Sequence, residues 1–384
     1  MKIRILFVID NIQFGGGERV FAQIINGLNP EKYSIFLASQ LSKHFYESIR
    51  NKKVRFFHLD FSKRINLILI FKLSKIIRKN KIQIVHGQGT RAEFYARIAN
   101  KIGERSKYVS TIAMPVEGFD VSPFRKKIYR FFDKLSERFV DRFIVVSDVL
   151  REMMIKKRGL PPDKVIRIYN GIEPDQYSPK NFKKSRLEVR KEFKINDTSL
   201  VIGAIGRLVW QKGFEYLIQA IPDVIKVDSN VRFIIVGDGP LMDRLKAQSS
   251  KLKVNDHLIL TGFREDIKEI LSAIDILVIP SLKEGFPMIT LEGMAMARPI
   301  IATHIDGITE QITNGETGIL VQPWDTNSLA RAIVKLLDNR KFAETLGLNA
   351  RRKVERDFLL EKMVVETEKI YQGLVATRKI SSLK

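Results

Sequence analysis

Short apolar runs of strand length alternate with amphipathic segments of helical length along the whole chain. Such alternation is typical of β-α-β units, in which helices cover both faces of a parallel sheet. In the first half the pattern predicts strands at residues 3–9, 34–38, 82–86, 108–112 and 142–146. In the second half it predicts strands at residues 200–205, 232–236, 258–260, 274–279, 299–302 and 318–321, and helices at 213–227, 240–252, 287–297 and 326–338. The expected fold class is α/β, with two doubly wound sheets.

The length of 384 residues fits two domains of ordinary size. Residues 175–197 are polar, contain proline and include only a short charged helical pattern, so they form the best linker. We therefore expect Rossmann-like domains at residues 1–178 and 179–356. A last amphipathic helix within residues 357–384 is expected to dock on an existing surface.

The chain contains no cysteine, which excludes disulfides, thiolate metal sites and a cysteine nucleophile. No apolar run approaches the roughly 20 residues that span a bilayer. The first ten residues read as a strand rather than as a signal peptide. These features predict a cytoplasmic protein.

The net charge of +23 is unevenly distributed, with +17 in residues 1–175 and +6 in residues 176–384. A basic N-terminal half attracts anionic partners such as nucleic acid, acidic phospholipid headgroups or a pyrophosphate-bearing lipid. Solvent-exposed helix faces in a generally basic protein would explain the same uneven net charge without an anionic partner. Both interpretations stay open.

Two glutamates bracket a predicted helix start in the segment Glu284-Gly285-Phe286-Pro287-Met288-Ile289-Thr290-Leu291-Glu292. Free amides at a helix N-terminus, together with the helix dipole, form a site for an anion such as a donor diphosphate. Ionised carboxylates are suited to accept hydrogen bonds from the vicinal hydroxyls of a sugar. The simpler interpretation is a helix start that acidic residues stabilise.

A second cluster runs from a predicted strand into a helix and contains Gly206, Arg207, Lys212 and Gly213. Open α/β sheets bind ligands at the carboxyl edge of their strands. Two cations at that edge would neutralise a diphosphate while bond cleavage builds negative charge on it. The alternative is a pair of solvated loop cations, which the preceding buried strand disfavours.

Three glycines, Gly15 to Gly17, join the first predicted strand to the first helix and allow backbone to approach a ligand closely. Val20 stands where the dinucleotide-binding fingerprint has its third glycine or alanine, so a dehydrogenase is disfavoured. The chain has no Asp-x-Asp pair, and its five histidines are scattered. We therefore expect neither a metal nor another cofactor.

Several short motifs occur in order over almost the whole chain. They are the glycine-rich first loop, Val85-His86, Val146-Ser147, Tyr169-Asn170-Gly171-Ile172, Gly206-Arg207-Leu208, Lys212-Gly213, Gly237-Asp238-Gly239-Pro240, Gly262-Phe263 and the pair Glu284 and Glu292. With these motifs the chain resembles the retaining glycosyltransferases of family 4, the group 1 family with the GT-B fold.

The resemblance implies an N-terminal acceptor domain and a C-terminal donor domain that face each other across a cleft, with the final helix crossing back to the first domain. It implies that Arg207 and Lys212 hold the donor diphosphate. Glu284 would bind hydroxyls of the transferred sugar, and Glu292 those of the ribose. The other implied donor contacts are Gly206, Gly285, Phe286, Pro287 and Met288, the backbone at Gly262, Phe263 and Arg264 for the nucleobase, and Gly16 and Gly17 from the opposite domain.

The resemblance also implies front-face attack, in which the departing phosphate oxygen takes the acceptor proton and no protein nucleophile is needed. Arg207, Lys212 and Glu284 would then be the catalytic residues, with no metal. Many family members carry a histidine two residues after the threonine equivalent to Thr111, where this chain has Ala113. Further candidate contacts to sugar or acceptor are Glu117, Asn170 and His86. For His86, a structural role is the alternative.

Two segments, residues 61–81 and 124–142, mix Lys and Arg with large apolar residues at helical spacing. An interfacial helix buries its apolar face in a bilayer while its basic side chains meet anionic headgroups. Helices that flank a sheet show a similar pattern, because their apolar face packs in the core. We favour core packing for the first segment and peripheral membrane contact for the second.

Together these features predict a metal-independent, retaining hexosyltransferase. It would move a hexose or N-acetylhexosamine from a nucleotide-sugar, with UDP favoured over GDP, to a surface-polysaccharide or lipid-linked acceptor. It would be cytoplasmic, or peripheral on the inner face of the membrane. The alternatives are a catalytically weak nucleotide-sugar-binding protein, which Ala113 suggests, and a nucleic-acid-binding protein, for which the sequence shows no recognition motif.

Overall fold

The computed structural model describes residues 2–10, 15–40, 42–61, 66–103, 106–114, 127 and 133–381. The contacts within it divide the chain into two units. The first unit comprises Met1–Gly171 and Leu360–Lys384, and the second comprises Ile172–Leu359. Every residue of the second unit is described.

In the first unit, the part of the chain that the structure describes forms a parallel sheet of seven strands in the order β3-β2-β1-β4-β5-β6-β7. The order reverses between β1 and β4, and ligands of such sheets bind beside the carboxyl ends of the strands at this reversal. The strands are Ile3–Ile9 (β1), Tyr33–Ser39 (β2), Arg55–His58 (β3), Ile84–Gln88 (β4), Lys107–Ile112 (β5), Arg142–Val145 (β6) and Val165–Arg167 (β7).

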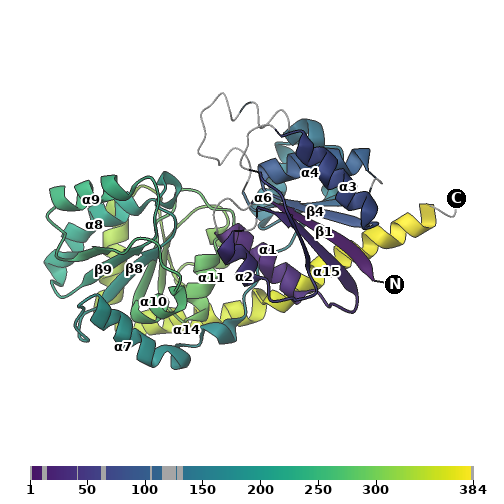
Figure 1. Ribbon diagram of the computed structural model, residues 1–384. Helices are drawn as coiled ribbons and strands as arrows, with labels where there is room; N and C mark the ends of the chain where they lie inside the picture. The colour runs from purple at the N-terminus through teal and green to yellow at the C-terminus, as the bar shows by residue number, and fades with distance from the viewer. Residues whose placement is uncertain are drawn as a thin grey trace. The chain divides into compact units, whose positions relative to one another are not determined.

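Helices cover both faces of this sheet (Figure 1). α3 and α4 pack along each other on one face, and α1 and α15 pack along each other on the opposite face. None of the described helices combines the length and apolar character needed to cross a membrane. The helices of the first unit are Gly16–Gly27 (α1), Lys43–Ser48 (α2), Ile68–Lys79 (α3), Thr90–Ile102 (α4), Asp148–Lys156 (α6) and Leu360–Ser381 (α15).

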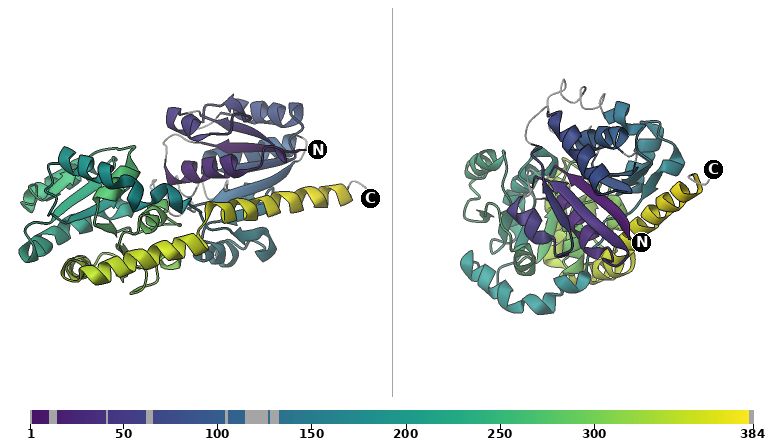
Figure 2. Two further views of the ribbon diagram at one scale, coloured as in Figure 1. Left: turned by 90° about the horizontal axis from the view of Figure 1, so that it is seen from below. Right: turned by 45° about the vertical axis from the view of Figure 1, so that its right-hand side comes forward.

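The last helix, α15, belongs to the first unit although the helix before it belongs to the second. It is drawn in yellow alongside the sheet of the first unit in Figure 2. Gly27 of α1 permits this close packing, because a Cβ atom there would lie 2.5 Å from Cγ2 of Val364. Tyr371 is fully buried under the sheet. The end of the chain thus forms part of the core of the first unit.

The second unit is built on a parallel sheet of six strands in the order β10-β9-β8-β11-β12-β13. Here the order reverses between β8 and β11, which are hydrogen-bonded neighbours with Ile276 opposite Ile202. The strands are Val201–Ile205 (β8), Arg232–Val236 (β9), Leu258–Leu260 (β10), Ile276–Ile279 (β11), Ile300–Thr303 (β12) and Ile319–Val321 (β13). Apolar side chains of β8, β9 and β11 pack in one core with α8 and α13.

The helices of the second unit are Lys183–Glu192 (α7), Phe214–Val227 (α8), Met242–Lys251 (α9), Ile267–Ala273 (α10), Met288–Ala295 (α11), Ile308–Gln311 (α12), Thr326–Asp338 (α13) and Arg340–Asp357 (α14). Strands and helices of the second unit alternate from β8 to β13, with α7 before β8 and both α13 and α14 after β13. Single 3-10 turns occur at Pro174–Tyr177 (η3), Pro179–Phe182 (η4) and Trp210–Lys212 (η5).

The predicted α/β class with two parallel, doubly wound sheets is confirmed. Each predicted strand is present, with its ends within two residues of those expected. β3 and β7 were not predicted, because they are short edge strands with polar or charged residues. The boundary between units falls after Gly171 rather than after residue 178, because Ile172 pairs with Leu359 and η3 packs on α11.

Candidate active site

Lys212 and Glu284 form an ion pair at the carboxyl edge of the second sheet. Nζ of Lys212 lies 2.5 Å from Oε1 of Glu284, which also accepts a hydrogen bond of 2.8 Å from the Ser281 hydroxyl. Lys212 closes the loop after β8, and Glu284 lies in the loop after β11. The neighbouring strands β8 and β11 thus bring together two predicted residues that are 72 positions apart.

Backbone contacts hold these two loops against each other. The carbonyl of Gln211 accepts hydrogen bonds from the amides of Leu282 and Lys283, at 2.7 and 3.3 Å. Gly213 has φ +62°, and a Cβ atom there would lie 2.0 Å from the carbonyl oxygen of Pro280. Only glycine fits this position, because any side chain would push the loops apart.

Arg207 lies in the same loop as Lys212, and its side chain is exposed. Its guanidinium makes no hydrogen bond or ion pair with the part of the chain that the structure describes. The two cations therefore differ: Lys212 is already paired with a carboxylate, whereas Arg207 presents its donors to solvent. An anionic ligand at this edge would meet Arg207 without first breaking an internal contact.

Glu292, the second predicted carboxylate, lies in α11 and is only 2% exposed. Its Oε1 accepts a hydrogen bond of 3.1 Å from the hydroxyl of Tyr177, which η3 supplies. Lys268 lies 4.9 Å above the Tyr177 ring and donates to Gln176 at 2.9 Å. The role of Tyr177 was missed in the sequence, where it lies in the expected linker and in no motif.

The segment between the two glutamates is buried. Pro287 is the N-cap of α11 rather than its first helical residue, and Gly285 and Pro287 are buried beside it. The Phe286 ring packs edge-on against Phe358, and Met288 is also in the core. Predicted donor contacts at residues 285–288 would therefore come from the backbone and not from these side chains.

The predicted nucleobase segment lies beside the loop after β9. The amide of Gly237 donates to the carbonyl of Gly262 at 2.9 Å, and the Phe263 side chain is exposed. The Arg264 guanidinium is bound by the carboxylates of Asp266 and Glu192, and these hydrogen bonds raise the pKa of Arg264. The Arg264 side chain therefore fixes this loop, while Phe263 presents a ring to solvent.

The residues of the first unit that were predicted to contact donor or acceptor are spread over several elements. Gly16 and Gly17 open α1, and the Glu18 carboxylate accepts from the amide of Gly15 at 2.9 Å. Asn170 is buried, and Glu117 lies outside the described residues. Ala113 follows β5 and is half-buried.

His86 is a core residue, which corrects its assignment as a candidate sugar or acceptor contact. It is fully buried, with Nδ1 at 2.5 Å from the Tyr371 hydroxyl and Nε2 at 2.7 Å from Oγ1 of Thr111. Burial lowers the pKa of His86 to about 3, so the ring is neutral. Both nitrogens are used to fasten α15 to β4 and β5.

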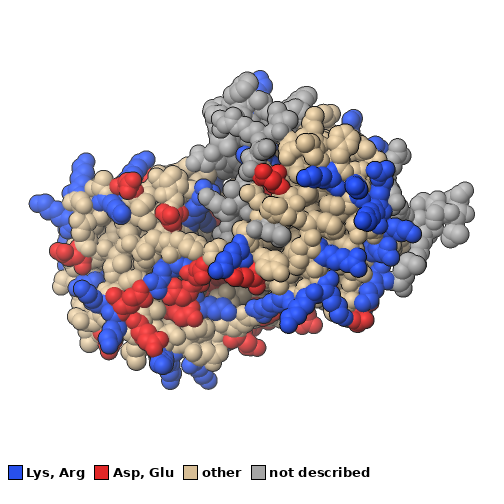
Figure 3. Space-filling view, in the orientation of Figure 1, with Lys and Arg blue, Asp and Glu red and all other residues tan. Residues whose placement is uncertain are grey.

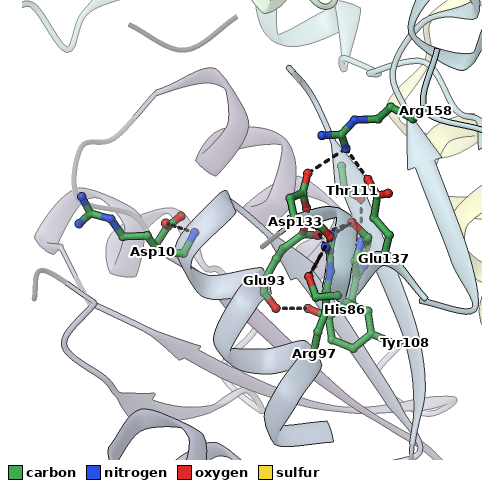
Figure 4. Close-up of polar contacts among 12 residues, drawn as sticks. Asp10, His86, Glu93, Arg97, Tyr108, Thr111, Asp133, Glu137 and Arg158 are labelled. Carbon is green, nitrogen blue, oxygen red and sulfur yellow. Dashed lines mark hydrogen bonds and ion pairs between the residues drawn. The ribbon is translucent and has the colours of Figure 1, made fainter. Parts of the chain in front are cut away.

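A buried network of charged groups in the first unit was also missed (Figure 4). Arg97 of α4 donates to Glu93 at 2.6 Å and to Asp133 at 2.8 Å. Arg158 lies 2.8 Å from Asp133 and 2.5 Å from Glu137. The sequence signal was the pair Glu93 and Arg97, four residues apart in a helix.

Burial raises the pKa of two carboxyls, Glu93 within this network and Asp10 after β1. It raises the pKa of Glu93 to about 7, against the opposing effect of the Arg97 charge. It raises the pKa of Asp10 to about 6, although the Arg91 amide donates to Asp10 at 3.2 Å. Among the described residues, no three histidines, aspartates or glutamates are grouped so that they could hold a metal ion.

Comparisons with known proteins identify the family and the fold of the chain. The model of the family "Glycosyl transferases group 1" matches residues 185–353, and that of "Glycosyltransferase Family 4" matches residues 14–176. The chain belongs to this family of glycosyltransferases, and its two α/β units are those of the GT-B fold.

Two relatives and one solved structure illustrate the similarity. The UDP-Gal:alpha-D-GlcNAc-diphosphoundecaprenol alpha-1,3-galactosyltransferase of Escherichia coli is 28% identical over 98% of both chains. The capsular polysaccharide biosynthesis glycosyltransferase CapM of Staphylococcus aureus is 26% identical over 79% of this chain and 80% of its own. The crystal structure of Anabaena Alr3699/HepE in complex with UDP-glucose superposes with a TM-score of 0.83, at 21% identity, over 96% of this chain and 99% of that one.

The buried imidazole predicts a pH dependence of stability. The pKa of His86 is lower in the folded protein than the unfolded value of 6.5, so the unfolded state binds the proton first as the pH falls. Below pH 6.5, the free energy of unfolding of the native protein should fall relative to that of His86→Gln by about 1.4 kcal/mol per pH unit.

Urea unfolding followed by circular dichroism measures this difference, because Trp210 and Trp324 both lie in the second unit and tryptophan fluorescence would miss the first. If the free energies of unfolding of the two proteins depended on pH in the same way, His86 would have the same pKa in the folded and unfolded states, which would contradict the prediction.

The Tyr177 hydroxyl is expected to stabilise the second unit. Tyr177→Phe removes one hydrogen bond to a buried carboxylate, which is worth about 1.5–3 kcal/mol in the free energy of unfolding. Tryptophan fluorescence during urea unfolding reports on this unit. Tyr216→Phe is the matched control, since among the described contacts its hydroxyl has no hydrogen bond; an equal effect of both changes would contradict the assignment.

Proposed function

We propose that the chain is a retaining, metal-independent glycosyltransferase that uses a nucleotide-sugar donor bound at the carboxyl edge of the second sheet. The observation that carries the proposal is the group formed by Arg207, Lys212 and Glu284 after the adjacent strands β8 and β11. This edge is the ligand site of open α/β sheets.

The two cations are suited to different parts of the diphosphate. A lysine ammonium has three donors, so Lys212 can keep its contact with Glu284 and give another donor to a phosphate oxygen. Arg207 offers a planar guanidinium that binds two oxygens at once. As the bond from the sugar to the diphosphate breaks, charge accumulates on the leaving oxygen, and both cations stabilise it without a metal.

The two glutamates are suited to bind hydroxyl groups of the donor. Glu284 is held in place by Ser281 and Lys212, which leaves its orientation defined before a sugar arrives. Glu292 is oriented by Tyr177 and is proposed to bind the ribose. Backbone at residues 285–288 and 262–264 is proposed to complete the donor site, with Phe263 beside the nucleobase.

In the proposed reaction the acceptor hydroxyl attacks the anomeric carbon on the face that the diphosphate leaves. The departing phosphate oxygen takes the hydroxyl proton, and anomeric configuration is retained. Arg207, Lys212 and Glu284 touch the reacting groups and are therefore the proposed catalytic residues. No protein nucleophile takes part.

The similarity to known proteins supports a UDP-sugar donor. The HepE structure contains UDP-glucose, and the name of the E. coli relative specifies UDP-Gal as donor and a diphosphoundecaprenol-linked sugar as acceptor. We propose a hexose or N-acetylhexosamine as the transferred group and a lipid-linked or surface-polysaccharide glycan as acceptor. The reaction would take place at the cytoplasmic face of a membrane.

The donor class can be tested by thermal shift with UDP-, GDP- and ADP-sugars. A nucleotide at 100 times its dissociation constant stabilises the protein by about 2.7 kcal/mol. We expect UDP-sugars to raise the melting temperature of the native protein, and Lys212→Ala and Glu292→Ala to reduce that shift. An undiminished shift in both variants would place the nucleotide elsewhere.

The role of Arg207 can be tested by kinetics. Arg207→Ala should lower turnover roughly 100-fold, because it removes a cation that stabilises the leaving diphosphate in the transition state. Arg331→Ala, which changes an exposed arginine of α13, is the control and should keep native turnover. A merely twofold loss in Arg207→Ala would contradict its catalytic role. Tight nucleotide binding with no transfer in the native protein would favour the binding-protein alternative.

A further inference from the structure

Helix α3 carries two different faces. Leu69, Leu73 and Ile77 point into the core of the first unit and are buried. Leu67, Ile68 and Phe71 are 60%, 64% and 68% exposed. Residues three or four positions apart share one side of a helix, so the start of α3 presents a compact group of three large apolar side chains to solvent.

Basic side chains continue this exposed side toward the end of the helix. Lys72, Lys75 and Lys79 are exposed at spacings of three and four residues, and Arg78 and Lys81 are exposed beside them. Residues 66–81 contain no aspartate or glutamate. In Figure 3, lysine and arginine side chains gather over the right-hand part of the molecule, where Figure 1 draws α3.

The exposed apolar side chains of α3 differ from others on the protein surface because they lie next to one another. Single exposed leucines or valines are common on protein surfaces and need no explanation. Leu187, Val227 and Leu348 of the second unit are of this kind, because they lie on three different helices. In α3, by contrast, the three apolar side chains adjoin one another and are followed by an unbroken basic strip.

We propose that this surface, formed by Leu67, Ile68, Phe71, Lys72, Lys75 and Lys79 and called the α3 surface, docks on an anionic lipid bilayer. The apolar side chains enter the boundary between headgroups and acyl chains, and the lysines meet the negative headgroups. The charge of the surface argues against a second copy of the chain as occupant, since two α3 surfaces would oppose lysine to lysine.

The core packing expected for residues 61–81 is confirmed for α3, and the proposal adds a second role for its exposed side. One side of α3 does pack in the core, and its other side provides the interfacial pattern. Of residues 124–142, where membrane contact was expected, the structure describes only residue 127 and residues 133–142. Membrane docking of the α3 surface does not depend on the donor site. A negative result for membrane binding can therefore be distinguished from a negative result for sugar transfer.

Vesicle sedimentation tests the proposal with the full chain. We expect binding to vesicles of equal parts phosphatidylglycerol and phosphatidylcholine, and little binding to vesicles of phosphatidylcholine alone. Each lysine is expected to contribute about fivefold to the partition coefficient at low salt, so Lys72→Gln, Lys75→Gln and Lys79→Gln combined should reduce it by roughly 100-fold. Added salt should weaken native binding.

A second variant, Leu67→Ser, Ile68→Ser and Phe71→Ser combined, should reduce binding at least about tenfold, as the apolar side chains no longer enter the bilayer. The matched controls are Leu187→Ser, Val227→Ser and Leu348→Ser combined, and Lys246→Gln, Lys251→Gln and Lys253→Gln combined; both should bind as the native protein does. All substituted side chains are exposed, so native melting temperatures are expected and are measured first.

Three results would overturn the proposal. The first is equal binding to neutral and anionic vesicles, and the second is equal loss in the α3 variants and their controls. The third is a native dimer, seen by light scattering, that the apolar α3 variant dissociates while vesicle binding stays unchanged. This last result would identify a second copy of the chain as the occupant.

Discussion

The candidate site depends on the close approach of two backbone segments, the loop after β8 and the end of β11. Gly213 leaves no space between itself and the Pro280 carbonyl, and Gln211 accepts two amides from the facing loop. A side chain at position 213 would separate the loops and with them Lys212 and Glu284. The ion pair is therefore a consequence of how the sheet ends, and the chemistry of the site follows from that geometry.

The two units differ in where the charged side chains described above lie. In the second unit, the charged groups of the candidate site lie at the sheet edge, where the Arg207 side chain is exposed. In the first unit, Arg97 is buried and paired with Glu93 and Asp133, and it also donates to Ser110 of β5. The neutral, buried His86 is hydrogen-bonded to Tyr371 and Thr111, so these contacts fasten α4 and α15 to the sheet. Burial of charge is costly unless it is paired, so these groups are suited to hold structure rather than to meet substrate.

Most strands and the presence of two parallel, doubly wound sheets could be predicted from the sequence, because apolar periodicity and βα alternation are local properties. The strand order and the short edge strands β3 and β7 could not. The sequence placed Lys212 after one predicted strand and Glu284 after another, whereas their direct pairing depends on the adjacency of β8 and β11 and on the contact between Gly213 and Pro280. His86 and Tyr371 are 285 positions apart, so no local pattern revealed their contact. The two faces of α3 share one periodic pattern, and only packing showed which apolar residues stay outside.

A double-mutant cycle at Lys212 and Glu284 tests the central claim most directly. UDP affinity is measured by calorimetry for the native protein, Lys212→Met, Glu284→Gln and the double variant. If the two side chains act as one unit, their effects do not add, and the interaction energy is about 0.5–3 kcal/mol. Effects that add to within about 0.3 kcal/mol would show that the pair does not govern nucleotide binding and would contradict the account.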